Sequence, residues 1–229
     1  MLNLNLNLKS LRFALMLAFT PLCISTGQAQ TVTAHRIGDF YEGGIIFYVS
    51  ADGQHGLIAA KEDQGGRRPW SNVTYTAGAS TFNANYTVTG TSGDGLFAGA
   101  MNTALIVGTQ IHYNPTGIFA GLVAANFSIQ SDGISNCASN ATGEMCFGDW
   151  YLPSLTEMSQ LVQVNHLYPE YGLNLVKCST ATKSAYWTST ESNGSDEATN
   201  AWVVDTCGTG ATATADKSVL FLTRPVRAF

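Results

Sequence analysis

The sequence contains little charge, and positive charge is especially scarce. Charged residues make up 12% of its 229 residues, about half the share that is usual in globular proteins. The first 29 residues contain two basic residues and no acidic one, so residues 30–229 hold 9 basic and 16 acidic residues, a net charge of −7. Because nucleic acids and sulfated polymers are bound through clustered lysine and arginine, this balance argues against nucleic acid or a polyanion as a partner.

The sequence also lacks the common signatures of enzyme chemistry. It has no Gly-x-Ser-x-Gly elbow, no His-Glu-x-x-His motif and no cysteine–histidine cluster with metal-ligand spacing. Residues 93–99 are rich in glycine, but a dinucleotide-binding turn also needs an acidic residue about 20 positions on. No such residue lies between Asp94 and Asp132. We therefore predict a non-catalytic protein without a nucleotide cofactor.

Long apolar runs are missing except at the N-terminus, where the pattern is that of a secretory signal peptide. Two basic residues precede the mostly apolar stretch 13–24, and the small residues of 27–29 precede a predicted cut before Gln30. Pro21 interrupts the run, which is shorter than the roughly 20 residues of a membrane-spanning helix. We predict that this segment is removed on export.

The predicted domain organisation is simple: a signal peptide at 1–29 and a single domain at 30–229. The second segment is long enough for a substantial core, and no internal repeat or low-complexity linker divides it. It also contains no further run long enough for a transmembrane helix. We expect the mature protein to be secreted, periplasmic or held at the cell surface.

Four cysteines remain once the signal peptide, with Cys23, is removed. An even number of cysteines in an exported chain indicates disulfides, and four cysteines allow three pairings. Proximity in the sequence favours Cys137 with Cys146 and Cys178 with Cys207. In the loop-entropy model each bridge stabilises the fold by about 3 kcal/mol.

Apolar periodicity and turn residues predict an α+β fold. The runs 44–49 and 56–60 are typical of a hairpin, and 186–190 and 201–205 of two further strands. Helical spacing of apolar residues predicts helices over 98–109 and 117–129, and a third from Ser154 to before Pro169. Three tryptophans in apolar strand contexts are predicted core residues: Trp150, Trp187 and Trp202.

The stretch from Asp149 to Thr156 joins two of these patterns. Its aromatic run predicts a strand that Pro153 ends, and Ser154 with Glu157 has the spacing of a helix capping box. We predict that this junction anchors the fold and has no catalytic role.

Five motifs, in the same order along the chain, resemble the Lcl C-terminal domain family, which is named after a collagen-like bacterial adhesin. They occupy nearly the whole mature chain: Gly38–Phe47, His55–Ala60, Asp149–Ser154, Tyr186–Glu191 and Arg224–Phe229.

This resemblance implies a C-type-lectin-like fold, with mostly antiparallel twisted sheets, two to three helices and long loops. It also implies that the C-terminal end lies beside Gly44–Val49, and it permits a homotrimer. The founding adhesin binds sulfated glycans, a property that the net charge of −7 argues against here. We predict a secreted or cell-surface, non-catalytic binding module that recognises a carbohydrate or glycoconjugate.

Two polar loops supply the candidate ligand-binding residues. In the loop 61–91, Trp70 is the predicted exposed ring for stacking against a sugar, and Arg67 and Arg68 are either anion ligands or part of a solvated loop. The loop 191–200, after the strand 186–190, supplies Glu191 and Asn193, and the end of the next predicted strand supplies Asp205.

Calcium is the candidate cofactor of the second loop, because this ion prefers hard oxygen ligands. Five residues offer such oxygens: Glu191, Asn193, Asp196, Glu197 and Asp205. The alternative for this segment is a polar turn beside an aromatic core strand.

Two further functions stay open at this level. The resemblance extends to formylglycine-generating enzymes, which predicts an oxidase with a catalytic thiol as an alternative, although pairing of all four mature cysteines would leave no nucleophile. The other alternative is a structural or interaction domain without a small ligand.

Overall fold

The computed structural model describes residues 33–71, 88–137, 145–179 and 184–229. All the elements named below belong to the compact unit Thr33–Phe229. The predicted signal peptide at 1–29 lies outside the described residues. No helix among the described residues is both long and apolar enough to cross a membrane.

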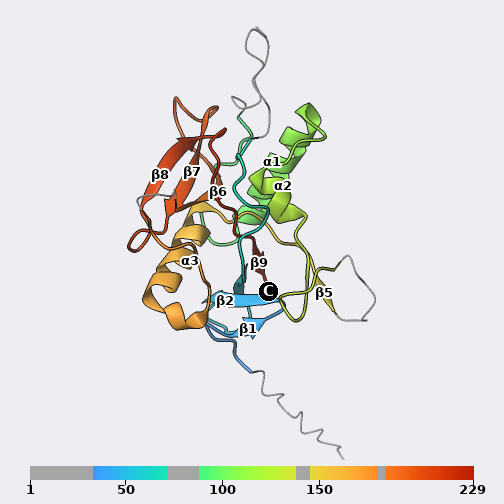
Figure 1. The fold of residues 1–229 in the computed structure, drawn as a ribbon, viewed down its shortest axis with the longest axis vertical. Coiled ribbons are helices and arrows are strands. Elements are labelled where there is room, and N and C mark those ends of the chain that lie inside the picture. Colours follow the sequence, from blue (N-terminus) through green and yellow to red (C-terminus); the bar gives the residue numbers. More distant parts are fainter. Residues whose placement is uncertain (1–32, 72–87, 138–144, 180–183) are drawn as a thin grey trace, which may run out of the picture. The chain divides into compact units, whose positions relative to one another are not determined.

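A four-stranded antiparallel sheet contains the predicted hairpin (Figure 1). Its strand order is β1-β2-β3-β9. Strands β2 and β3 pair from Gly44 with Ala60 to Val49 with Gly56, which confirms the hairpin. The strand bounds are β1 Phe40–Tyr41, β2 Gly44–Val49, β3 Gly56–Ala60 and β9 Val226–Ala228.

The C-terminal strand takes a different neighbour from the one predicted. We expected the chain's end beside Gly44–Val49, but β9 pairs with β3, where Leu57 is opposite Ala228. The other edge of β2 is covered by β1, in which Phe40 pairs with Ile45. A turn at 42–43 places β1 on one edge of β2, and the hairpin turn after Val49 places β3 on the other, so both edges of β2 are paired.

A second antiparallel sheet consists of β6 (Ala185–Glu191), β7 (Asn200–Asp205) and β8 (Thr212–Asp216). The first two confirm the predicted strands, and all of β6 is buried. Strand β8 was not predicted, because it is short of apolar residues and largely exposed.

In the described part of the chain three α-helices accompany the sheets, which confirms the α+β class: α1 Gly99–Tyr113, α2 Ala120–Ala125 and α3 Leu155–Leu167. Helix α2 is shorter than the predicted helix 117–129. Its chain leaves the helix at Asn126 and continues into β4 (Ile129–Gln130), which pairs with β5 (Cys146–Phe147). A short 3-10 helix, Pro169–Tyr171, follows α3.

Both predicted disulfides are present. Cys137 is bonded to Cys146, and Cys178 to Cys207. The first bridge joins the loop after β4 to β5, and the second joins the segment before β6 to the turn after β7. The favoured one of the three possible pairings is therefore confirmed.

The Asp149–Thr156 junction lies between the core clusters. Trp150, Tyr151 and Leu152 are buried and belong to three different clusters. The predicted strand is reduced to one bridge, between Tyr151 and Val226 of β9. The stretch is irregular because its three consecutive side chains serve separate parts of the core, which a regular alternating strand does not allow.

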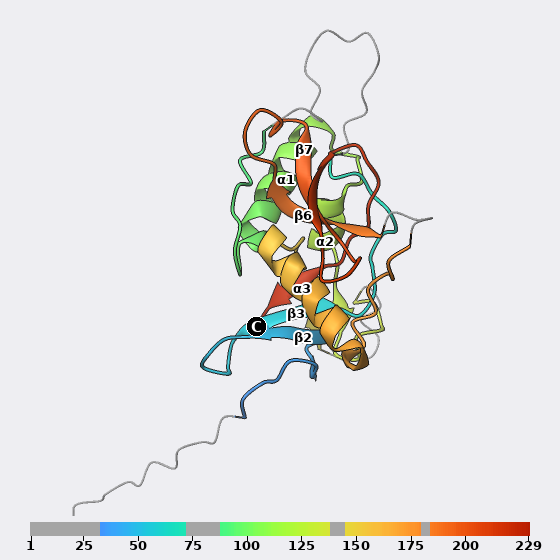
Figure 2. The same cartoon turned by 90° about the vertical axis from the view of Figure 1, so that its left-hand side faces the viewer.

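The largest core cluster lies between α3 and the four-stranded sheet. Figure 2 shows α3 lying across β2 and β3, and the cluster includes Phe47, Leu57, Met158 and Leu161. Trp150 and Trp187 are confirmed as core residues, whereas Trp202 is only half-buried.

Helix α3 begins with the predicted capping box, whose acidic member is fully buried. The Glu157 carboxylate accepts hydrogen bonds from Ser154 N (2.7 Å), Phe97 N (2.6 Å) and the Tyr151 hydroxyl (3.1 Å). Burial raises the pKa of Glu157, and these donors only partly oppose that effect.

Glu157 should therefore make folding depend on pH in a defined direction. A raised pKa in the folded protein means that the stabilisation is complete below the unfolded pKa of about 4.3 and is lost as pH rises through the folded pKa. Urea denaturation at a series of pH values should show the free energy of unfolding of the wild type falling relative to that of Glu157→Gln as pH rises from about 4. Glu170→Gln, at an exposed position, should keep the wild-type dependence. A wild-type minus Glu157→Gln difference that does not vary with pH would contradict this role.

Candidate functional site

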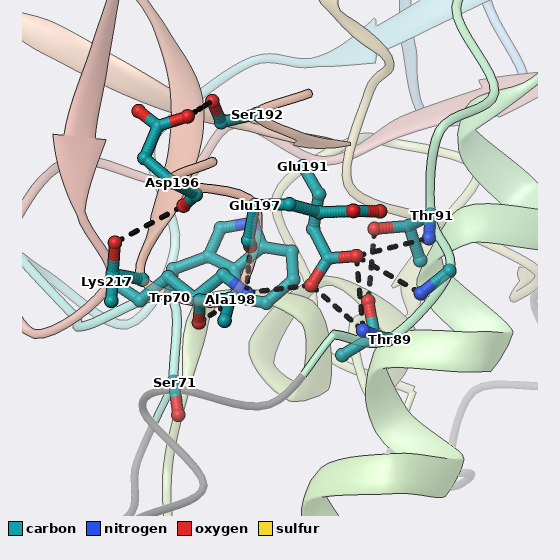
Figure 3. Close-up of polar contacts among 12 residues, drawn as sticks. Trp70, Ser71, Thr89, Thr91, Glu191, Ser192, Asp196, Glu197, Ala198 and Lys217 are labelled. Carbon is teal, nitrogen blue, oxygen red and sulfur yellow. Dashed lines mark hydrogen bonds and ion pairs between the residues drawn. The ribbon is translucent and has the colours of Figure 1, made fainter. Parts of the chain in front are cut away.

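The two predicted ligand loops meet at a buried ion pair between Glu191 and Lys217 (Figure 3). Lys217 Nζ lies 2.6 Å from Glu191 Oε1, and both side chains are 0% exposed. The carboxylate also accepts hydrogen bonds of 2.9 to 3.3 Å from the backbone N–H groups of Thr89, Gly90 and Thr91. Glu191, predicted to bind ligand or calcium, is therefore an internal ion-pair partner instead.

The Lys217 ammonium occupies the position among the oxygens of loop 192–199 where a bound cation could lie. Besides Glu191, its ammonium donates to the carbonyl oxygens of Glu197 and Ala198, at 3.0 Å each. The Nζ atom also lies 4.7 Å from the centroid of the Trp70 ring. Burial lowers the pKa of Lys217, and the bond to Glu191 opposes that shift. Three oxygens match the three N–H donors of an ammonium group, so the lysine holds strand end and loop together.

The prediction that Trp70 is exposed is wrong. The ring is 0% exposed, and its Nε1 donates to Thr188 O at 2.8 Å. It packs in the cluster that includes Phe119 and Trp187, because segment 68–71 runs against β6 and the residues before β9. The ring is therefore closed to a sugar.

The neighbouring arginines lie in the same segment. Arg67 and Arg68 are half-buried. The Arg68 backbone pairs with Phe221, and its carbonyl accepts from Trp187 Nε1 at 2.9 Å. The segment thus joins the core through its backbone, and anion binding by the two side chains stays a prediction.

The remaining acidic candidates are used locally. Asp196 accepts from Ser192 Oγ (2.6 Å) and Asn200 Nδ2 (2.8 Å), which lower the pKa of its carboxyl. Asp205 accepts from Cys207 N at 2.7 Å. Glu197 is half-buried and Asn193 is exposed.

No three of the four predicted acidic calcium ligands, Glu191, Asp196, Glu197 and Asp205, bring their carboxylate oxygens close enough to share a metal. Within the described parts of the chain, the one group of three acidic, histidine or cysteine side chains close enough to share a metal is Asp205 with Cys178 and Cys207. These two sulfur atoms are bonded to each other, so they are not thiolate ligands. Calcium binding by the exposed members of the loop stays a prediction.

The first predicted loop, in contrast, lines an open pocket of about 440 Å³. One wall is formed by residues 61–65, directly after β3. The other wall is formed by residues 123–136, from the last turn of α2 through β4. The lining residues are Lys61, Glu62, Gln64, Gly65, Val123, Asn126, Phe127, Ser128, Ile129, Gly133, Ile134 and Asn136. We refer to this cavity as the loop pocket.

The wall 61–65 is fixed by a partly buried ion pair. Asp63 Oδ1 lies 2.8 Å from Arg224 Nε and 2.7 Å from Arg224 Nη2. The Tyr186 hydroxyl donates to Asp63 Oδ2 at 3.0 Å. Arg224 also donates to Ala60 O and Leu173 O. Since these groups come from β3, β6 and the segment before β9, the wall is positioned by the core.

The opposite wall contains a tight turn. Asp132 accepts from Ser135 Oγ (2.6 Å), Ser135 N and Ile134 N, and these bonds lower the pKa of its carboxyl. The turn is followed by the Cys137–Cys146 bridge. Asx turns and disulfides both reduce the freedom of a loop, so this wall is also preorganised.

Two glycines allow close approaches at the pocket: Gly65 lets the two walls meet, and Gly133 lets the second wall lie against β1. Gly65 has φ 65°, and a Cβ there would lie 2.9 Å from Val123. Gly133 has φ 67°, and a Cβ there would lie 2.8 Å from the Phe40 ring. A larger residue at either position would strain the backbone and clash.

The pocket offers both polar and apolar contacts. Gln64, Asn126 and Asn136 provide amide groups, and Lys61 with Glu62 provides one charge of each sign. Phe127 provides an aromatic ring and packs edge-to-face on Trp150, with the two ring centroids 5.1 Å apart.

Only one of the two walls was predictable as part of a ligand loop. The polar composition of 61–65 indicated a recognition loop, whereas the helical spacing through Phe127 predicted a continuing helix where the second wall lies. The Asp-Gly-x-Ser turn at 132–135 is the signal that could have revealed this second wall.

The model of the Lcl C-terminal domain family matches residues 110–227. The match covers the pocket wall 123–136 and not the wall 61–65. No curated protein matches the chain.

Removal of the Lys217 cation should be strongly destabilising. Lys217→Met leaves Glu191 buried without its partner, which should lower the free energy of unfolding by about 3 to 5 kcal/mol. Combining it with Glu191→Gln removes the uncompensated charge and should recover part of the loss. Guanidinium denaturation is the measurement.

Lys177→Met, at an exposed position, is the matched control and should change the stability by no more than about 0.5 kcal/mol. Equal losses for Lys217→Met and the double variant would show that the charge is not the cause.

Proposed function

The chain belongs to the Lcl C-terminal domain family, and from that premise we propose that it is a non-catalytic binding module that takes a neutral carbohydrate or glycoconjugate in the loop pocket. The observation that carries the proposal is the pocket itself, about 440 Å³ in volume and lined by amide groups, one charge of each sign and an aromatic ring. Sugars present hydroxyl groups at their edges and C–H groups on their faces. The amide side chains of the pocket can hydrogen-bond to the sugar hydroxyls, and the Phe127 ring can pack against the C–H face.

The electrostatics favour a neutral ligand. Lys61 and Glu62 both line the pocket, so their charges offset each other. Two of the other basic residues of the mature chain, Lys217 and Arg224, are buried in ion pairs. The scarcity of free positive charge supports a neutral sugar over a sulfated one.

The cysteines support a binding role over the oxidase alternative. Cys137, Cys146, Cys178 and Cys207 all lie in disulfides, whereas that alternative requires a thiolate nucleophile. Disulfides also suit export from the reducing cytosol, so we place the mature protein outside it, secreted, periplasmic or at the cell surface.

A glycan array with the purified mature protein tests the proposal. We expect binding to neutral glycans, with sulfated glycans no better than their unsulfated counterparts. Parallel arrays with calcium and with a chelator separate the loop pocket from a calcium-dependent site on loop 192–199. Absence of any glycan above background would refute the carbohydrate proposal.

Substitutions of two exposed asparagines locate the site on the protein. Asn126→Ala removes an amide from the loop pocket, and a lost hydrogen bond should weaken binding of the best array glycan about three- to tenfold, measured by titration calorimetry. Asn193→Ala, in the other candidate loop, is the matched control and should leave the affinity unchanged. The reverse pattern would move the site to loop 192–199.

A further inference from the structure

The rim of the loop pocket carries two large apolar side chains that are exposed to solvent. Ile134, which also lines the pocket, is 75% exposed. Phe40, in β1, is 48% exposed and does not itself line the pocket, but its ring lies next to two lining residues, Gly133 and Lys61. Exposed apolar groups next to a pocket are typical of binding surfaces, whereas single scattered ones are not.

Gly133 joins these two side chains into one surface. It precedes Ile134 in the turn and lies so close to Phe40 that a Cβ on it would be 2.8 Å from Phe40 Cε2. The positive φ of 67° at Gly133 holds the turn in this position. The apolar rim therefore consists of Phe40 and Ile134 on either side of a glycine.

Lys61 connects the rim to the polar part of the pocket. Its Nζ lies 5.5 Å from the centroid of the Phe40 ring, and the same residue lines the pocket beside Glu62 and Gln64. A ligand that hydrogen-bonds inside the pocket thus has an apolar surface directly beyond it. The polar and apolar parts form one continuous amphipathic site.

We propose that the natural ligand of the loop pocket is an amphiphilic glycoconjugate, whose sugar occupies the pocket and whose apolar aglycone covers Phe40 and Ile134. This inference rests on the proposed function and adds the chemical class of the group linked to the sugar. The aglycone can be an alkyl chain or an aryl group, because both are apolar and both shield the side chains of Phe40 and Ile134 from water. Burial of several methylene groups makes a large difference in affinity, about fourfold for each one.

Three sets of synthetic glycosides test the inference. Methyl, n-hexyl and phenyl glycosides of glucose, galactose, mannose and N-acetylglucosamine are titrated into the full mature protein by calorimetry. We expect the hexyl or phenyl glycoside of the preferred sugar to bind at least about tenfold more tightly than its methyl glycoside. Comparison of the hexyl and phenyl series identifies the aglycone as alkyl or aryl.

Two variants and one control assign the gain to the rim. Phe40→Ala should remove most of the preference for the long aglycone while leaving methyl glycoside binding unchanged, because Phe40 does not line the pocket. Ile134→Ser, at a lining residue, should lower the affinity for the hexyl or phenyl glycoside more than the affinity for the methyl glycoside. Met101→Ser, in α1 at a comparable exposure of 68%, should keep the preference. Thermal unfolding of each variant verifies that it is folded, and Ile134, in an exposed turn, provides the test if Phe40→Ala is unstable.

The outcomes separate this inference from the proposed function. Equal affinities for methyl, hexyl and phenyl glycosides would overturn the inference and leave sugar binding intact. Binding of free 1-hexanol as tight as that of hexyl glycosides would also overturn it, because the rim would then act without the pocket. Failure of every glycoside to bind would overturn both.

Discussion

The buried pair of Lys217 and Glu191 is the interaction on which the arrangement of the loops around β6 depends. It joins the end of β6, residues 89–91, loop 192–199 and Trp70 at one point. A buried charge is tolerated only when its partners satisfy it, so each of these segments constrains the others. The low charge content has a structural consequence here: Lys217 and Arg224, two of the few cations, are used inside the fold rather than displayed on its surface.

This use of charge explains why the two candidate loops differ. Loop 192–199 contains oxygen atoms suited to a cation, but two of its carbonyls and the adjoining Glu191 already surround a lysine ammonium. Loop 61–65 is held from beneath by the Asp63–Arg224 pair, which leaves the side chains of Lys61, Glu62 and Gln64 to line a cavity. Loop 192–199 therefore binds the internal ammonium of Lys217, whereas loop 61–65 is fixed by Asp63 and exposes its other side chains to the pocket.

Local signals made much of the fold predictable. The hairpin, the capping box at Ser154 and both disulfides depend on residues close together in the sequence, where spacing determines which groups can meet. Trp70 and Glu191 were misassigned because their partners, Thr188 and Lys217, lie 118 and 26 residues away. A polar neighbourhood in sequence says little about burial when the backbone on either side pairs with distant strands. The shortened α2 and the strand β8 were missed for the same reason, since tertiary packing overrides weak local preference.

The loop pocket is positioned by both long-range contacts and local ones. Its walls come from segments about 60 residues apart, and each is fixed by its own anchor, the Arg224 cluster on one side and the Asp132 turn with its disulfide on the other. Binding to a preorganised pocket avoids the entropy cost of ordering loops, which matters most for sugars, because their hydroxyl groups exchange one set of hydrogen bonds with water for another at little net gain. An apolar rim adds the burial of apolar surface, which contributes favourable binding free energy because that surface forms no hydrogen bonds with water that must be given up. In the carbohydrate-binding role that we propose, the fixed walls and the rim of Phe40 and Ile134 address the same physical weakness of sugar recognition.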